Sequence, residues 1–235
     1  MSTLNHYQQA IGDPLVHWTP RALPARIVIE GRYCRLEPLN PEHHAADLFA
    51  SYSVAPDDRG WTYLSIGPFA NVSEYSAYLE GAAASADPLH YAVIDLKSGI
   101  AVGTVALMRI DRVNGVVEVG FVVFSPLLQR SPLSTEAQYL LMKYVFDELG
   151  YRRYEWKCDS LNTPSRQAAA RLGFTFEGLF RQAVVYKQRT RDTAWFSIID
   201  SEWPAISSAF EKWLAVENMD EQGVQRYALS EIRSS

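Results

Sequence analysis

The sequence predicts a single α/β domain with a mixed, largely antiparallel central sheet of about seven strands, flanked by helices. Two junctions and one turn indicate this fold. The β-branched and aromatic run 116–124 leads into a helix that begins at Ser131-Pro132, and the run 151–158 leads into a helix that begins at Asn162. Asn114-Gly115, before the first run, is the strongest hairpin signal in the chain.

The other elements follow from apolar periodicity and from turn residues. The expected strands are, in order, two short ones within 26–38, then 89–96, 101–110, 116–124, 151–158, 174–186 and 193–199, the last two joined by a turn at 189–192. The expected helices begin at Asn40-Pro41, Asn71, Ser131, Asn162 and Trp203 and end near residues 52, 86, 150, 173 and 216.

We divide the chain into three parts. Residues 1–25, with Pro14, Pro20 and Pro24, are expected to form an extended arm that packs on the body. Residues 26–216 form the domain, and the polar residues 217–235 are expected to be a loose tail.

Composition narrows the class of protein. The chain has 235 residues, a formal net charge of −5 and a pI near 5.6, which argues against general nucleic-acid binding and favours a cationic substrate. Cys34 and Cys158 stand far apart without zinc-ligand spacing, so we expect no disulfide framework, no metal and a reducing cytoplasmic setting. No apolar run approaches the length of a membrane helix, and no leader pattern is present.

The first strand-to-helix junction is a candidate anion site. A buried strand, a tight polar loop and a helix start present free backbone amides, and the helix dipole places roughly +0.5 of a charge there. A phosphate group is the ligand that such a junction favours.

Several motifs in order carry a family resemblance. They are Val117-Glu118-Val119-Gly120, the segment Gln129 to Ala137, Asn162-x-x-Ser165, Leu172-Gly173-Phe174 and Glu177-Gly178. Together they resemble the GNAT superfamily of acetyl-CoA-dependent N-acetyltransferases, in its RimJ/RimL-like branch, over about residues 31–199. The resemblance implies a sheet that is splayed at a cofactor cleft.

The family's phosphate loop, Gln/Arg-x-x-Gly-x-Gly/Ala, corresponds to residues 129–134, where Pro132 replaces a glycine and removes one amide. The resemblance therefore implies cofactor binding by Gln129, by the Arg130 guanidinium and by the remaining amides of Arg130, Ser131, Leu133, Ser134 and Thr135. The alternative is that Ser131-Pro132 only caps a helix.

In the family, a splayed central strand frees an amide that polarises the thioester carbonyl, which here implies Phe121, Val122 and Val123. Glu118 shares a face of an ideal strand with Gly120 and Val122, so it is the expected proton acceptor, with the glycine leaving room for a ligand. A salt-bridged strand carboxylate is the alternative.

The second helix start supplies further candidates. The resemblance implies that Asn162 contacts the cofactor and that Ser165 donates a proton to the leaving thiolate, although both could simply serve the helix start. Tyr186 is a second candidate acid. Cys158 is expected to be a small buried residue rather than a nucleophile, because no histidine is adjacent.

In the resembling family, the first two helices cover the acceptor side of the cleft, and an irregular segment lies between them here. Asp57, Asp58, Trp61 and Tyr63, with Phe69, offer carboxylates and rings that suit a cation. An acidic surface turn held by buried aromatics is the alternative.

The resemblance predicts direct acetyl transfer from acetyl-CoA to a primary amine, either a protein N-terminus or a small molecule, without a metal, a membrane or a nucleic acid. It also allows a homodimer. The alternative function is a catalytically degenerate acyl-CoA-binding or regulatory module, which the Pro132 departure favours. A P-loop phosphotransferase is disfavoured because no Gly-Lys-Ser/Thr follows the loop.

Overall fold

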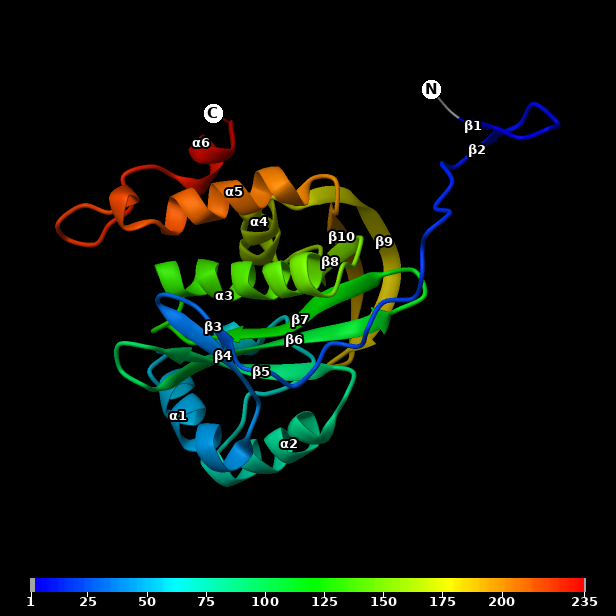
Figure 1. Cartoon of the computed structure of the whole chain (residues 1–235). Helices are drawn as coiled ribbons and strands as arrows, with labels where there is room; N and C mark the ends of the chain where they lie inside the picture. The colour runs from blue at the N-terminus through cyan, green and yellow to red at the C-terminus, as the bar shows by residue number, and fades with distance from the viewer. Residues whose placement is uncertain (1–2, 235) are drawn as a thin grey trace.

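The computed structural model describes residues 3–234 and is built on one eight-stranded sheet in the order β3-β4-β5-β6-β7-β8-β10-β9 (Figure 1). Neighbouring strands are antiparallel except β7 and β8, which are parallel. The strands are β3 (Ile29–Glu30), β4 (Cys34–Pro38), β5 (Leu89–Asp95), β6 (Ala101–Asp111), β7 (Val116–Phe124), β8 (Arg153–Asp159), β9 (Thr175–Tyr186) and β10 (Arg189–Ile199). The predicted fold class is confirmed, with eight strands rather than about seven.

Helices cover both faces of the sheet. They are α1 (Pro41–Ser53), α2 (Val72–Ala84), α3 (Pro132–Lys143), α4 (Thr163–Leu172), α5 (Trp203–Leu214) and α6 (Leu229–Ser234), with short turns η1 (Asp58–Trp61), η2 (Tyr144–Glu148) and η3 (Val216–Asn218). In Figure 1, α1 and α2 lie on one side of the sheet and α3 and α5 on the other. Across residues 3–234, no helix combines the length and apolar character needed to cross a bilayer.

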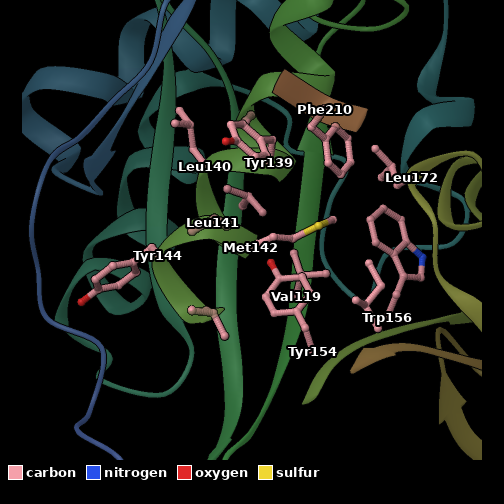
Figure 2. Close-up of a cluster of buried hydrophobic side chains, with 14 of the residues drawn as sticks. Val119, Tyr139, Leu140, Leu141, Met142, Tyr144, Tyr154, Trp156, Leu172 and Phe210 are labelled. Atoms are coloured by element: carbon pink, nitrogen blue, oxygen red, sulfur yellow. The ribbon is translucent and has the colours of Figure 1, made fainter. Parts of the chain in front are cut away.

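The larger core lies between the sheet and α3. Val119, Tyr154 and Trp156 face Met142 of α3 in Figure 2, and α5 adds Phe210 to the same cluster. A smaller core on the opposite face packs α1 and α2 against β5 and β6. The alternation along each strand therefore assigns every residue to the α3 face or to the α1–α2 face.

Asparagine caps begin the first two helices as predicted. The Asn40 side chain accepts from the Glu42 amide at 2.9 Å, and Asn71 accepts from the Glu74 amide at 2.9 Å. The Glu74 carboxylate accepts in return from the Ala70 amide at 2.8 Å. Each cap satisfies an amide that the helix leaves open.

The β9–β10 turn is one element that the prediction misplaced. Arg189 already pairs with Tyr186, so the turn consists of Lys187 and Gln188 rather than residues 189–192. Both turn residues have positive φ, 46° and 59°, as a two-residue hairpin loop requires. Neither residue is a usual turn former, which is why the position could not be recognised.

The chain ends differ from each other. Hydrogen bonds anchor the arm to the domain. Among them, the Trp18 indole donates to Val113 O at 2.8 Å, Tyr151 donates to Ala22 O, and Tyr91 donates to Ala25 O. Its first part, the hairpin β1 (Thr3–Leu4) and β2 (Ala10–Ile11), projects away from the body (Figure 1).

The C-terminal tail, which we expected to be loose, folds back onto the domain because Leu229 of α6 is buried in the larger core.

Candidate active site

Strands β7 and β8 part near their carboxyl ends. Their parallel pairing runs from Val116 with Arg153 to Val119 with Trp156 and stops there, although β7 continues to Phe124 and β8 to Asp159. The predicted splay is therefore present. Because the two strands are parallel, the loops that follow them, which start α3 and α4, meet at the same edge of the sheet.

A β-bulge at Phe121 lies beside this opening. The β6 partners move from Ala106 with Gly120 to Thr104 with Val123, so β7 has one extra residue here, and Phe121 has a φ of 47°. The bulge shifts the alternation, and Val122 packs against the α3-side core. The expectation that Val122 shares a face with Glu118 was wrong, because an ideal strand has no bulge.

The space beside Gly120 is also not open. A Cβ at this position would collide with the Met108 sulfur from the adjacent strand β6. The space beside Gly120 is therefore occupied by the Met108 side chain, and it is not left open for a ligand as we expected.

The loop before α3 is held tightly while the helix start is left uncapped. The Gln129 side chain donates to Phe124 O at 2.7 Å, and Leu128 is fully buried. Ser131 has the extended backbone of an N-cap, but its hydroxyl donates to Leu128 O at 2.6 Å and caps no amide. The first turn of α3 contains no acidic residue, so the helix dipole and the amides that remain free are available to an anion. The Ser134 amide is not among them, because it donates to Ser131 O at 3.2 Å.

Two arginines lie at this helix start. Arg130 is exposed, has a φ of 55°, and its guanidinium pairs with no other group in the described part of the chain. Arg171, from the last turn of α4, donates to the Thr135 hydroxyl at 3.0 Å. We did not predict Arg171, because only the fold brings the end of α4 to the start of α3.

The start of α4 presents a serine hydroxyl. Asn162 accepts from the Ser165 amide at 3.1 Å, which is the predicted cap. The Ser165 hydroxyl accepts from the Trp156 indole at 3.0 Å, and its own proton is directed toward the Cys158 sulfur. Burial raises the pKa of the neighbouring Cys158 thiol, in keeping with an unreactive cysteine.

Tyr186, the second candidate acid, is held at the end of β8. Its hydroxyl donates to a carboxylate oxygen of Asp159 at 2.8 Å. Burial, assisted by that carboxylate, raises the pKa of Tyr186 to about 12. Its proton is thus retained at neutral pH and is directed at Asp159.

Glu118 is buried and salt-bridged. One carboxylate oxygen lies 2.8 Å from the Lys157 ammonium and 3.1 Å from the Arg109 guanidinium. Burial raises the pKa of Glu118, and the two cations oppose but do not cancel this effect. The Glu118 carboxylate is therefore more basic than usual and is also part of an ion pair. The geometry is compatible with both predicted roles, a proton acceptor and a structural salt bridge.

Residues 57–63, which we call the strap, follow α1 and lie against the start of α4 and the β9–β10 hairpin. Tyr63 donates to Leu161 O at 3.2 Å, next to the start of α4, and the β9–β10 hairpin holds the strap through Lys187, which donates to Trp61 O at 2.9 Å. The Trp61 ring packs edge-on against Tyr52 and Phe69. The strap thus brings predicted acceptor residues beside predicted cofactor residues.

The two acidic residues of the strap are arranged differently. Asp57 caps η1 by accepting from the Arg59 amide at 3.1 Å, and it also pairs with the Arg59 guanidinium at 2.7 Å. The hydrogen bonds from Arg59 lower the pKa of Asp57. Asp58 is exposed and has no side-chain partner in the described residues, so it is the carboxylate that remains available to a cation.

No group of three or more His, Cys, Asp or Glu side chains within residues 3–234 is arranged to hold a metal ion. The polar groups near the strand opening include the backbone amides at the start of α3, the Ser165 hydroxyl, the Arg130 guanidinium and the ion-paired Glu118 carboxylate. The donors in this set suit a phosphorylated, thioester-bearing ligand.

Comparisons with known proteins agree with this geometry. The acetyltransferase (GNAT) domain pattern matches residues 34–175. The crystal structure of a GCN5-related N-acetyltransferase from Brucella melitensis is similar with a TM-score of 0.92 and 53% identity, covering 94% of this chain and 100% of that one. An N-acetyltransferase named p20 from Bacillus licheniformis is 27% identical over 161 residues, 67% of this chain and 89% of p20.

A third relative is YdaF of Bacillus subtilis, assigned as a ribosomal N-acetyltransferase. It is 28% identical over 108 residues, which are 46% of this chain and 58% of YdaF. This similarity agrees with the RimJ/RimL-like motifs of the sequence. With the domain pattern covering more than half of its residues, the chain belongs to the GNAT acetyltransferase family.

Proposed function

We propose that the protein transfers an acetyl group from acetyl-CoA to a primary amine by direct attack. The observation that carries the proposal is the opening between β7 and β8, which lies beside the uncapped start of α3. Family membership supports it, and one relative with the same fold, MccE, has been solved in complex with acetyl-CoA and AMP.

The cofactor diphosphate would lie at the amides of the α3 start, from Arg130 and Ser131 to Leu133 and Thr135, with the Arg130 guanidinium as an additional donor. Pro132 provides no amide, so the Arg130 charge compensates for a missing hydrogen bond. The pantetheine arm would enter the strand opening beside Phe121, Val122 and Val123, and the Asn162 side-chain amide would contact it.

The chemistry follows from groups around this opening. The amine nitrogen forms a bond to the acetyl carbon, the bond from that carbon to sulfur breaks, and the sulfur takes a proton from Ser165. Water then returns a proton to the Ser165 oxygen. Glu118, whose pKa is raised by burial, accepts the proton that the amine gives up. An amide freed by the bulge polarises the carbonyl.

The acceptor would approach past the strap. Trp61 and Tyr63 offer ring faces to a cation, and Asp58 and the paired Asp57 add negative charge. A protein N-terminus and a small amine both fit this description, and the relationship to YdaF favours the former. We further propose a cytoplasmic location, since both cysteines are free and buried.

The experiment that tests the function combines acetyl-CoA binding with turnover. Binding to the native state should raise the melting temperature, and above Kd the increase should grow with the logarithm of the ligand concentration. A screen over small amines and N-terminal peptides would then follow acetyl-CoA consumption and identify the acetylated product by mass. Neither binding nor turnover at millimolar acetyl-CoA would reject the enzyme.

The second candidate function is an acyl-CoA-binding module that has lost activity. The observation in its favour is Pro132, which removes an amide from the phosphate loop. Binding of acetyl-CoA without turnover of any amine in the same screen would support this candidate over the enzyme.

A further inference from the structure

His90 is a buried imidazole on the α1–α2 face of the sheet that no structural role explains. Its neighbours on β5, Leu89 and Tyr91, point into the α3-side core, so His90 points to the opposite face. It is only 4% exposed, and no hydrogen bond in residues 3–234 involves its ring nitrogens. The ring nitrogens are not among the fully buried side-chain atoms that lack a partner, so they are both unpaired and within reach of a small molecule.

The ring lies beside the bulge. His90 pairs with Ala106 of β6, and Ala106 pairs with Gly120 of β7, the residue before Phe121. The His90 and Phe121 rings are 5.0 Å apart between centroids. The unpartnered imidazole is therefore directed at the part of β7 where the proposed function puts the reacting carbonyl.

The charges around His90 disfavour a cation at this point. Arg26, which directly follows the arm, is the charged group that acts on the ring. Glu118 lies on the same face of β7, but its carboxylate is already paired with Lys157 and Arg109. Burial, followed by Arg26, lowers the pKa of His90 to about 4, so the ring is neutral in the working pH range.

We propose that a ring nitrogen of His90 accepts a hydrogen bond from the acceptor amine and holds it, in its uncharged form, against the bulge at Phe121. This inference rests on the proposed function and deepens it. An uncharged amine can donate one N–H to the imidazole and keep its lone pair free to attack. An ammonium ion has no lone pair and would meet the Arg26 charge, so it must first lose one proton to solvent, and Glu118 remains free to take the second proton when the nitrogen attacks.

Two variants separate hydrogen bonding from packing. His90→Phe keeps an aromatic ring against Phe121 but accepts no hydrogen bond, whereas His90→Gln keeps an acceptor. With the amine that the screen finds fastest, His90→Phe should lower kcat/KM by roughly 10- to 100-fold, as expected for an unmade hydrogen bond at a reacting group. His90→Gln should recover part of the loss, and the KM for acetyl-CoA should change less than about twofold in both.

A second measurement uses the unmodified protein. In protein labelled with ¹⁵N-histidine and saturated with free CoA, which cannot react, the same amine should shift a ring-nitrogen resonance of His90. A wild-type kcat/KM in His90→Phe, or an unmoved resonance at saturating amine, would overturn the inference while leaving the proposed function intact. Wild-type protein that turns over no amine would reject both.

Discussion

The Lys157 ammonium lies 2.8 Å from Glu118 on the neighbouring strand β7 and 2.7 Å from Glu155 on its own strand. The side chains of Lys157 and Glu118 are each 7% exposed, so this pair is buried at the point where β7 and β8 begin to part. Glu118 is the carboxylate that we propose as the proton acceptor, so its ion pair with Lys157 affects how readily it takes up a proton.

Glu118→Gln should lower kcat by about 10² to 10⁴, because the amide cannot take a proton, and it should flatten the rise of kcat with pH. The matched control is Glu155→Gln, which removes the other carboxylate bound to Lys157 without touching the proposed acceptor. Steady-state kinetics between pH 5.5 and 9 would check this. If both variants retain wild-type kcat, Glu118 is a structural ion pair only.

Glu136→Gln should destabilise the domain. The buried Glu136 carboxylate of α3 accepts from the amides of Arg32, Tyr33 and Cys34, each at 2.7 Å, and so fixes the β3–β4 turn. A glutamine has one acceptor oxygen instead of two and no charge, and losing part of this set should cost about 3 kcal/mol of unfolding free energy. Urea unfolding would measure it.

The control for this prediction is Glu148→Gln, at an exposed position near the end of the same helical segment. It should change the unfolding free energy by less than about 0.5 kcal/mol. Equal stability of the two variants would show that the turn does not depend on the Glu136 carboxylate.

His90 should contribute to the acid sensitivity of the fold. Its pKa is about 4 in the native protein and about 6.5 when unfolded, so between these values the unfolded chain binds a proton that the native state does not. Stability therefore falls as the pH drops from about 6.5 to 4, by up to about 3 kcal/mol from this group.

The wild-type protein should consequently lose more stability over this range than His90→Phe does, as measured by urea unfolding at pH 7, 5.5 and 4.5. Arg26 is the charged group that acts on His90, so both variants are compared at fixed ionic strength. His17→Gln, on the exposed arm, is the control and should follow the wild type. Identical pH dependence of wild type and His90→Phe would contradict the prediction.

Arg130→Ala should weaken acetyl-CoA binding by about tenfold at low salt, since a charge-assisted hydrogen bond is worth about 1.5 to 3 kcal/mol. The reason is that Arg130 is unpaired and lies beside amides that no side chain caps. The loss should shrink at high ionic strength, because exposed charges are screened. Calorimetry would measure it, with Arg181→Ala on the exposed strand β9 as the control.

Much of this architecture could be predicted because local signals agree with it. Asn40 and Asn71 cap helices where the sequence places them, and the runs at 116–124 and 151–158 form the strands that part. These features depend on residues close together in the chain, where periodicity and capping act. The strand end and helix start that form the loop we propose for phosphate binding could also be located from the sequence.

The remaining features depend on tertiary contacts. A non-glycine residue with positive φ, Phe121, creates the bulge, and nothing in its aromatic and β-branched run indicates one. Arg171 and His90 come to the site only through packing, so neither was predicted. The short tail around Leu229 shows no apolar periodicity that would predict a helix. Burial of the Leu229 side chain nevertheless holds the tail against the domain.

Releasing the strap should affect the acceptor and not the cofactor. Two cations of the β9–β10 hairpin hold it by backbone carbonyls: Lys187 donates to Trp61 O at 2.9 Å and Arg189 to Thr62 O at 2.6 Å. Both contacts are exposed, so each contributes modestly, and removing both should make the strap more mobile without unfolding the domain.

The double variant Lys187→Ala, Arg189→Ala should therefore raise the KM for the amine at least about threefold while changing that for acetyl-CoA by less than twofold, since we propose that the acceptor approaches past the strap. Hydrogen exchange of residues 57–63 should become faster in the same protein. Lys97→Ala with Arg181→Ala removes two exposed cations elsewhere and controls for net charge. Asp58→Asn should raise the amine KM further if the free carboxylate attracts the acceptor. Faster exchange in the strap with unchanged amine kinetics would exclude residues 57–63 from the acceptor site and leave the amine to enter from another side of the cleft.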